Sequence, residues 1–270
     1  MAVFTCHFES KVLNFTTAFR IIIPTKFPMP GEELKEHYEN KGKLPVLWLF
    51  HGGSDSYRDW QDCTKLQLYA EKYNIAVVTP DAQNGSYATM AYGPDWFSYV
   101  SKELPEYIYD RFPISRERKD NFIAGMSMGG LGALKTALTY PENYSVCCPI
   151  ASAVDLLNEY VNYRTDPRGI SFGKQFSTIY GHFEHPEEAL GGPEDCYALL
   201  DKDLAEGKEL PKLMMSQGTE DFTYKGNKRF YDYATNKGVE IKWVEEPGMH
   251  DWDSWNLYLP KVFEFIDENR

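Results

Sequence analysis

The fold is decided by the stretch Gly125-Met126-Ser127-Met128-Gly129. A predicted strand at 121–125 leads into it, and a predicted helix of small residues at 128–139 follows it. A serine at a sharp turn between a strand and a helix is typical of a nucleophile elbow, because glycines let the two elements approach closely. The start of that helix directs free N–H groups toward whatever Ser127 attacks. The alternative interpretation is a packing turn with an incidental serine.

Outward from this motif, short apolar runs alternate with helical patterns. The predicted strands are 2–9, 11–23, 46–50, 75–79, 121–125, 145–151, 212–217 and 239–245. The predicted helices are 56–73, 95–110 with a kink at Pro105, 128–139, 224–237 and 252–268, which contains Pro260. Residues 24–44 are rich in proline and glycine and predict a loop. The alternation predicts one α/β domain over 1–270, with an eight-stranded, mostly parallel sheet and helices on both faces.

The composition excludes several classes of protein. The chain has 270 residues with 16 Phe, 19 Tyr and 6 Trp, which is too aromatic for a disordered protein. Its longest apolar runs fall short of the roughly 18 residues of a spanning helix. The net charge of −12 disfavours nucleic acid and anionic membrane surfaces as partners. Five irregularly spaced cysteines and the lack of a secretory pattern at the N-terminus favour reduced thiols and a cytoplasmic location.

A serine hydroxyl needs a general base, and the chain has six histidines. His250 follows the last predicted strand, which is the position that the order serine, acid, histidine requires. The acid should follow the preceding strand, where both Glu220 and Asp221 can serve. His51, after the strand at 46–50, is the rival base, although a structural place in its loop is the simpler interpretation.

An oxyanion hole needs two backbone donors. One is the N–H of Met128, the residue after the candidate nucleophile. The other should come from the loop His51-Gly52-Gly53-Ser54 after the third strand. Glycine lets the backbone approach a substrate closely, so we expect the N–H of Gly53 to be the second donor.

The stretch 152–208 shows no clear strand and is too long for an ordinary connection. We interpret it as a cap insertion over the carboxyl ends of the strands, where ligands of open α/β sheets bind. A peripheral helical excursion is the alternative. Its aromatic residues wall a pocket or fill the core of the cap: Tyr160, Tyr163, Phe172, Phe176, Tyr180 and Phe183.

Two further segments are open to more than one interpretation. Residues 81–87, after the fourth predicted strand, either border the active site or form a plain surface turn, and the surface turn is the simpler prediction. His182 and His185 in the insertion resemble a metal pair only loosely, so no metal site is predicted.

Four motifs together resemble the esterase D family of α/β-hydrolases, which includes tributyrin esterases, S-formylglutathione hydrolases, feruloyl and acetylxylan esterases and mycolyl transferases. The resemblance covers nearly the whole chain, is nearest to small bacterial tributyrin or acetyl esterases, and is weakest over 152–208. It rests on Leu47-Trp48-Leu49-Phe50-His51-Gly52-Gly53, Gly125-Met126-Ser127-Met128-Gly129-Gly130, Gly218-Thr219-Glu220-Asp221-Phe222 and Gly248-Met249-His250-Asp251-Trp252.

The resemblance implies a triad of Ser127, Asp221 and His250, with the N–H groups of Gly53 and Met128 as the oxyanion hole. It favours Asp221 over its neighbour as the acid. Many relatives carry a larger residue where Gly53 stands, so the resemblance implies the backbone donor but not the shape of the acyl pocket.

The sequence therefore predicts a serine carboxylesterase for short acyl esters, acetyl to butyryl, including acetylated or feruloylated carbohydrate. Its partner is a small-molecule ester, no cofactor or metal is expected, and the resemblance favours a homo-oligomer. The alternatives are a thioesterase of the S-formylglutathione type, an acyltransferase, and a non-catalytic binding protein on the same scaffold.

Overall fold

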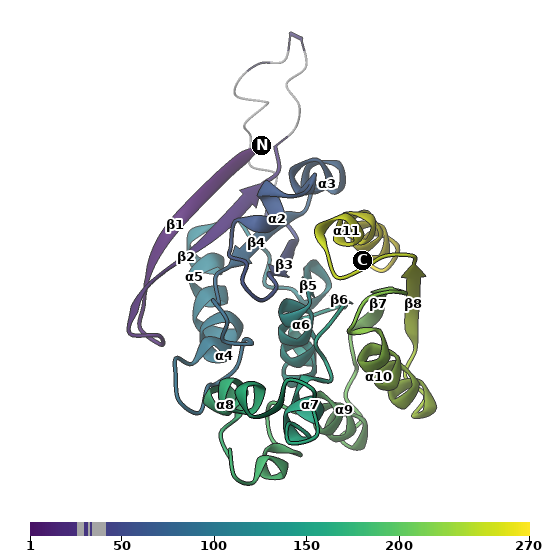
Figure 1. Cartoon of the computed structure of the whole chain (residues 1–270). Helices are drawn as coiled ribbons and strands as arrows, with labels where there is room; N and C mark the ends of the chain where they lie inside the picture. Colours follow the sequence, from purple (N-terminus) through teal and green to yellow (C-terminus); the bar gives the residue numbers. More distant parts are fainter. Residues whose placement is uncertain (26–29, 32, 34–41) are drawn as a thin grey trace.

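The computed structural model in Figure 1 describes residues 1–25, 30, 31, 33 and 42–270, so most of the loop predicted at 24–44 lies outside the described residues. The strands form one sheet in the order β1-β2-β4-β3-β5-β6-β7-β8. β2 runs antiparallel to β1 and β4, and the pairs from β4 to β8 are parallel. This confirms the predicted sheet. The strands are β1 (Ala2–Ser10), β2 (Phe15–Ile23), β3 (Val46–Phe50), β4 (Ala76–Pro80), β5 (Asn121–Met126), β6 (Val146–Ile150), β7 (Lys212–Gly218) and β8 (Ile241–Glu246).

The central strands are apolar throughout because helices cover both faces of the sheet. In β3, Val46, Trp48 and Phe50 belong to the hydrophobic cluster on one face. Leu47 and Leu49 point the other way and belong to the cluster on the opposite face. The period of two along a strand therefore divides one continuous apolar run between two cores.

Helices α5, α6, α9 and α10 pack on one face of the sheet, and α3 and α11 pack on the other (Figure 1). The fold is that of the α/β-hydrolases. The helices are α2 (Asp59–Asp62), α3 (Leu66–Tyr73), α4 (Trp96–Ser98), α5 (Leu104–Arg111), α6 (Met128–Thr139), α7 (Leu156–Val161), α8 (Gly169–Tyr180), α9 (Cys196–Ala205), α10 (Tyr224–Asn236) and α11 (Trp252–Glu268), with the π-helix η1 (Tyr99–Glu103) and the short 3₁₀ helices η2 (Arg118–Asp120), η3 (Pro141–Asn143) and η4 (Pro186–Ala189).

Two predicted helices are divided in the structure. The helix expected at 56–73 separates into α2 and α3, because the Thr64 hydroxyl bonds the Trp60 carbonyl and accepts from the Leu66 N–H. The helix expected at 95–110 consists of α4, the π-helix η1 and α5. Pro105 lies in the first turn of α5, where its missing N–H is tolerated, so the irregularity precedes the proline. Pro260 lies inside α11 without ending it.

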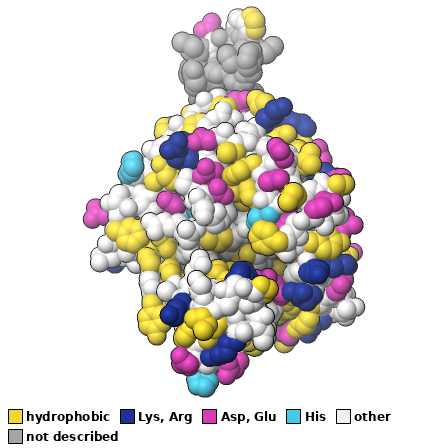
Figure 2. Space-filling view, viewed as in Figure 1, with side chains coloured by type: hydrophobic (Ala, Val, Ile, Leu, Met, Phe, Trp, Pro, Cys, Tyr) yellow, Lys and Arg dark blue, Asp and Glu magenta, His cyan; other side chains and the backbone are white. Residues whose placement is uncertain are grey.

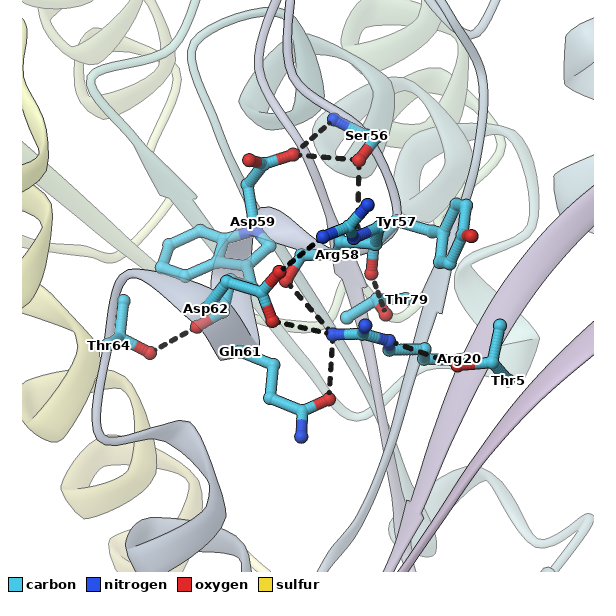
Figure 3. Close-up of polar contacts among 11 residues, drawn as sticks. Thr5, Arg20, Ser56, Tyr57, Arg58, Asp59, Gln61, Asp62, Thr64 and Thr79 are labelled. Carbon is cyan, nitrogen blue, oxygen red and sulfur yellow. Dashed lines mark hydrogen bonds and ion pairs between the residues drawn. The ribbon is translucent and has the colours of Figure 1, made fainter.

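A polar cluster joins the N-terminal strands to the segment after β3 (Figure 3). The Arg20 guanidinium donates to Asp62 Oδ1 at 2.8 Å and to Gln61 Oε1 at 3.0 Å, and its Nε donates to Thr5 Oγ1 at 3.2 Å. Arg20 holds the pKa of Asp62 below its ordinary value, mainly through this hydrogen bond. The strands β1 and β2 are thereby linked to α2, the first helix after β3.

The stretch 152–208 is helical and contains α7, α8, η4 and α9. α7 and α8 lie side by side below the sheet in Figure 1. Their buried aromatics form a small hydrophobic cluster of their own, whereas Cys196 and Leu200 of α9 belong to the main core beside α6. The last helix of this stretch, α9, therefore packs on the central sheet beside α6. That the stretch 152–208 acts as a cap stays a prediction.

The surface shows no separation of charge by sign on the face seen in Figure 2, where acidic, basic and hydrophobic side chains are interspersed. None of the helices in the described part of the chain combines the length and apolarity needed to cross a bilayer.

Candidate active site

The candidate residues meet at the carboxyl edge of the parallel strands. Ser127 follows β5, His51 follows β3, Asp221 follows β7 by three residues and His250 follows β8 by four. Parallel strands deliver their carboxyl ends to the same edge, so residues distant in sequence converge there.

The turn at Ser127 is sharp and strained. Ser127 has φ 53° and ψ −120°, a conformation that L residues adopt rarely. A Cβ on Gly129 would lie 2.5 Å from the carbonyl oxygens of Phe50 and His51, and one on Gly125 would overlap the backbone of Gly129. Only glycine at both positions lets α6 start this close to β3 and β5. This is the geometry expected of a nucleophile elbow.

Ser127, His250 and Asp221 are joined in series by hydrogen bonds. Ser127 Oγ lies 2.8 Å from His250 Nε2, and His250 Nδ1 lies 2.8 Å from Asp221 Oδ2. The other carboxylate oxygen of Asp221 accepts from the N–H and the hydroxyl of Thr223, both at 2.8 Å. Its side chain is fully buried, so its orientation is fixed from both sides.

The loop that carries His250 is held by two carboxylates. Glu220 Oε2 accepts from the Gly248 N–H at 2.5 Å, and this bond holds the pKa of Glu220 below its ordinary value. Asp251 caps α11 by accepting from the Ser254 N–H at 2.9 Å, which lowers the pKa of Asp251 in the same way. Glu220, the alternative acid, therefore supports the loop, while its neighbour contacts the imidazole.

Aromatic rings surround the imidazole of His250. The ring of Phe222 lies 4.4 Å from it, centroid to centroid, and that of Trp255 lies 5.3 Å away, nearly perpendicular. Phe222 is 76% exposed and Met249 is 62% exposed, so apolar side chains reach the surface next to His250 in sequence and in space. Asp55, which follows the glycines of the loop after β3, is half-buried, and burial together with the nearby Asp59 raises its pKa.

His51 is part of the architecture rather than a free base. Its side chain is fully buried, its Nδ1 lies 2.7 Å from the Gly52 carbonyl oxygen, and its Nε2 accepts from the Ala82 N–H at 3.0 Å. Both ring nitrogens are therefore occupied by backbone groups.

The two expected oxyanion donors lie at the ends of neighbouring strands. Met128 is the first residue of α6, where a backbone N–H has no partner within the helix. Gly53 lies three residues beyond the end of β3, and the Asn84 side chain approaches it.

The segment 81–87 is not the plain surface turn that the sequence favoured. Tyr87 is fully buried, and its hydroxyl bonds the backbone of His51. Asn84 Oδ1 accepts from the Ser54 N–H at 2.7 Å. The sequence of this segment does not predict these contacts, because they depend on β4 lying beside β3 in the sheet.

The aromatic residues of the insertion serve mainly as its core. The most buried of them, Tyr160, Tyr163, Phe172 and Tyr180, pack together in one cluster. His182 and His185 pair with Glu188 and Glu187. Within the described residues, no group of three or more His, Cys, Asp or Glu side chains is arranged to hold a metal ion.

Comparisons with known proteins show the family and the fold of the chain. The model of the Esterase family, described as "Putative esterase", matches residues 33–266. The acetyl esterase of Caldicellulosiruptor saccharolyticus is 28% identical over 99% of both chains. The fluorophosphonate-binding serine hydrolase F of Staphylococcus aureus superposes with a TM-score of 0.84 at 28% identity, over 98% of both chains. The S-formylglutathione hydrolase of the same organism gives 0.81 at 29%, again over 98% of both. The chain therefore belongs to the Esterase family and is a carboxylic ester hydrolase of the α/β-hydrolase fold.

Proposed function

We propose that the chain is a serine carboxylesterase that hydrolyses short acyl esters, acetyl to butyryl. One observation carries the proposal, the hydrogen-bonded series from Ser127 Oγ through the His250 imidazole to the Asp221 carboxylate. A serine is a weak nucleophile unless a base takes its proton, and a base works best when a third group orients it. The acetyl esterase among the relatives supports the short acyl group.

The proposed mechanism assigns one task to each group. Ser127 Oγ attacks the ester carbonyl carbon while His250 Nε2 takes its proton, and the carbonyl oxygen becomes an oxyanion. The N–H groups of Gly53 and Met128 stabilise this oxyanion. The imidazolium then gives its proton to the leaving alcohol as the C–O bond breaks. Water repeats the cycle on the acyl-enzyme and releases the acid, and Asp221 stabilises the imidazolium throughout.

The test is kcat/KM on chromogenic acetate, butyrate and octanoate esters. We expect the acetate and butyrate esters to be the best substrates. Ser127→Ala should lose about 10⁶-fold in kcat and keep only the residual rate that substrate binding and the oxyanion hole supply. Wild-type activity in this variant would contradict the proposal.

A second candidate is a thioesterase of the S-formylglutathione type, because a structural neighbour of that name covers the whole fold. The same three residues would serve it, so the substrate decides. A higher kcat/KM on S-formylglutathione than on acetate esters would favour the thioesterase. Failure of a fluorophosphonate to label Ser127, together with inactivity on both substrates, would favour a non-catalytic protein instead.

A further inference from the structure

The side chain of Tyr87 forms hydrogen bonds with the backbone at the start of the loop that carries Gly53. The His51 N–H donates to the Tyr87 hydroxyl at 2.9 Å, and the hydroxyl donates to the His51 carbonyl oxygen at 3.2 Å. One side chain thus satisfies both backbone groups of the residue at which the chain leaves β3. The hydroxyl is fully buried, so water cannot replace it there.

Close packing against two neighbouring elements fixes the position of the ring that carries this hydroxyl. It stacks on Phe50 with the centroids 4.4 Å apart and the planes 5° from parallel. A Cβ at Gly132 would lie 2.5 Å from the ring, so α6 has a glycine where the ring packs against it. The position of the hydroxyl is therefore set by both β3 and the helix that follows Ser127.

The backbone at Tyr87 is held in a conformation that needs support. Ser86 and Tyr87 both have φ 51°, in the left-handed region. The Tyr87 carbonyl oxygen accepts from Lys135 Nζ at 2.7 Å, and this buried ammonium also pairs with Glu194. Glu194 in turn accepts from the Thr89 N–H at 3.1 Å. Strained residues persist near functional sites only where the surroundings over-determine them, as they do here.

The same segment supports the loop at two further points. Asn84 Oδ1 accepts from the Ser54 N–H, and the Ala82 N–H donates to His51 Nε2. The loop 51–54 is therefore bound before and after Gly53 by residues that follow β4.

We propose that Tyr87 is a positioning residue of the esterase reaction, whose hydroxyl fixes the loop 51–54 so that the Gly53 N–H faces the developing oxyanion. This inference rests on the proposed function. An oxyanion forms only in the transition state, so a displaced donor lowers kcat and leaves KM almost unchanged. A misplacement of 1 Å can cost about 10²-fold in rate.

The experiment compares Tyr87→Phe with Tyr109→Phe, measured on the butyrate ester. Both variants keep the ring and lose one hydroxyl. That of Tyr109 donates to Asn121 Oδ1 at 2.7 Å, at the amino end of β5 and away from Ser127. We expect Tyr87→Phe to lower kcat about 10- to 100-fold with KM within about twofold, and Tyr109→Phe to keep the wild-type kcat. Asn84→Ala should give a smaller fall, since it removes only the bond to Ser54.

A second measurement, amide hydrogen exchange of the peptide covering 46–57, reads the loop without substrate. Tyr87→Phe should exchange faster at 51–54, and Tyr109→Phe should not. A Tyr87→Phe variant with wild-type kcat and exchange would overturn the inference, as would equal losses in both variants. If the wild type hydrolyses no ester, the proposed function fails by itself. Faster exchange in Tyr87→Phe would then still support the positioning of the loop, and unchanged exchange would overturn it.

Discussion

At the scale of single residues, Glu220 and Asp221 are adjacent carboxylates with different surroundings. Asp221 is buried and contacts the imidazole of His250, whereas the Glu220 side chain contacts the backbone of Gly248. The direction in which each side chain leaves the turn after β7 decides this difference. The sequence around the two residues does not reveal this direction. For this reason it leaves both Glu220 and Asp221 as candidates for the acid of the triad.

This contrast yields a prediction. Asp221→Asn keeps the shape of the side chain but favours the wrong imidazole tautomer, so kcat should fall about 10⁴-fold. Glu220→Gln keeps an acceptor for the Gly248 N–H and should stay within about tenfold of wild type, because a charged acceptor gives a hydrogen bond roughly twice as strong as a neutral one. Steady-state kinetics on the butyrate ester measure both. The assignment is wrong if the Glu220 variant is the more damaged of the two.

At the scale of elements, the approach of α6 to β3 depends on the absence of a side chain. Gly129→Ala places a Cβ 2.5 Å from two backbone carbonyl oxygens, which cannot rotate away as a side chain would. We expect a loss of about 1–3 kcal/mol in the free energy of unfolding, measured by urea denaturation. The control is Gly93→Ala, which is exposed and meets only the flexible Met90 side chain, with an expected change within about 0.5 kcal/mol. Equal stability of the two variants would contradict this account of the elbow.

Most elements could be predicted because their patterns are local. The strand at 46–50 is apolar at every position, and the chain folds it as β3 with the same limits. The sequence predicts no separate helix at α9 within the insertion, although Cys196 and Leu200 are spaced four residues apart and lie on one face of it. The break between α2 and α3 depends on one threonine hydroxyl, which a pattern of apolar spacing does not register.

The juxtaposition of Ser127 with His250 was also predictable, because the topology of a parallel sheet brings strand ends together. The role of Tyr87 was not. Its contact with His51 requires β4 to lie beside β3, a glycine in α6, and two consecutive residues at positive φ. Each of these is a tertiary condition, and the sequence around residue 87 contains only the weak indication of Asn84-Gly85-Ser86, residue types that favour turns.

At the scale of the whole molecule, the five cysteines differ sharply in accessibility, and all carry free thiols. Cys147, Cys148 and Cys196 are buried, and burial raises the pKa of Cys196 to about 12. Cys63 is exposed, but partial burial and the neighbouring Asp59 raise its pKa as well. Since the thiolate is the reactive form, a raised pKa slows modification at pH 8 and the rate should increase as the pH rises.

We therefore predict the order in which a disulfide reagent such as DTNB modifies the native protein. Cys63 should react first and Cys6, which is partly buried, should follow more slowly. The three buried thiols should react only after unfolding in guanidinium. Cys63→Ser should remove the first phase and leave the others unchanged. Rapid reaction of more than two thiols in the native state would contradict the packing described for β6 and α9.

The small hydrophobic cluster formed by α7, α8 and η4 has a consequence for engineering and for evolution. The segment from Ser152 to the start of α9 packs its aromatic side chains against one another and against Ala88 and Met90 of the segment after β4, and both of its ends attach to elements of the central sheet. In chain order it stands between Ser127 and Asp221, yet neither residue belongs to it. A replacement segment of different length or composition therefore has to keep the packing against Ala88 and Met90, because these residues continue the chain from Tyr87.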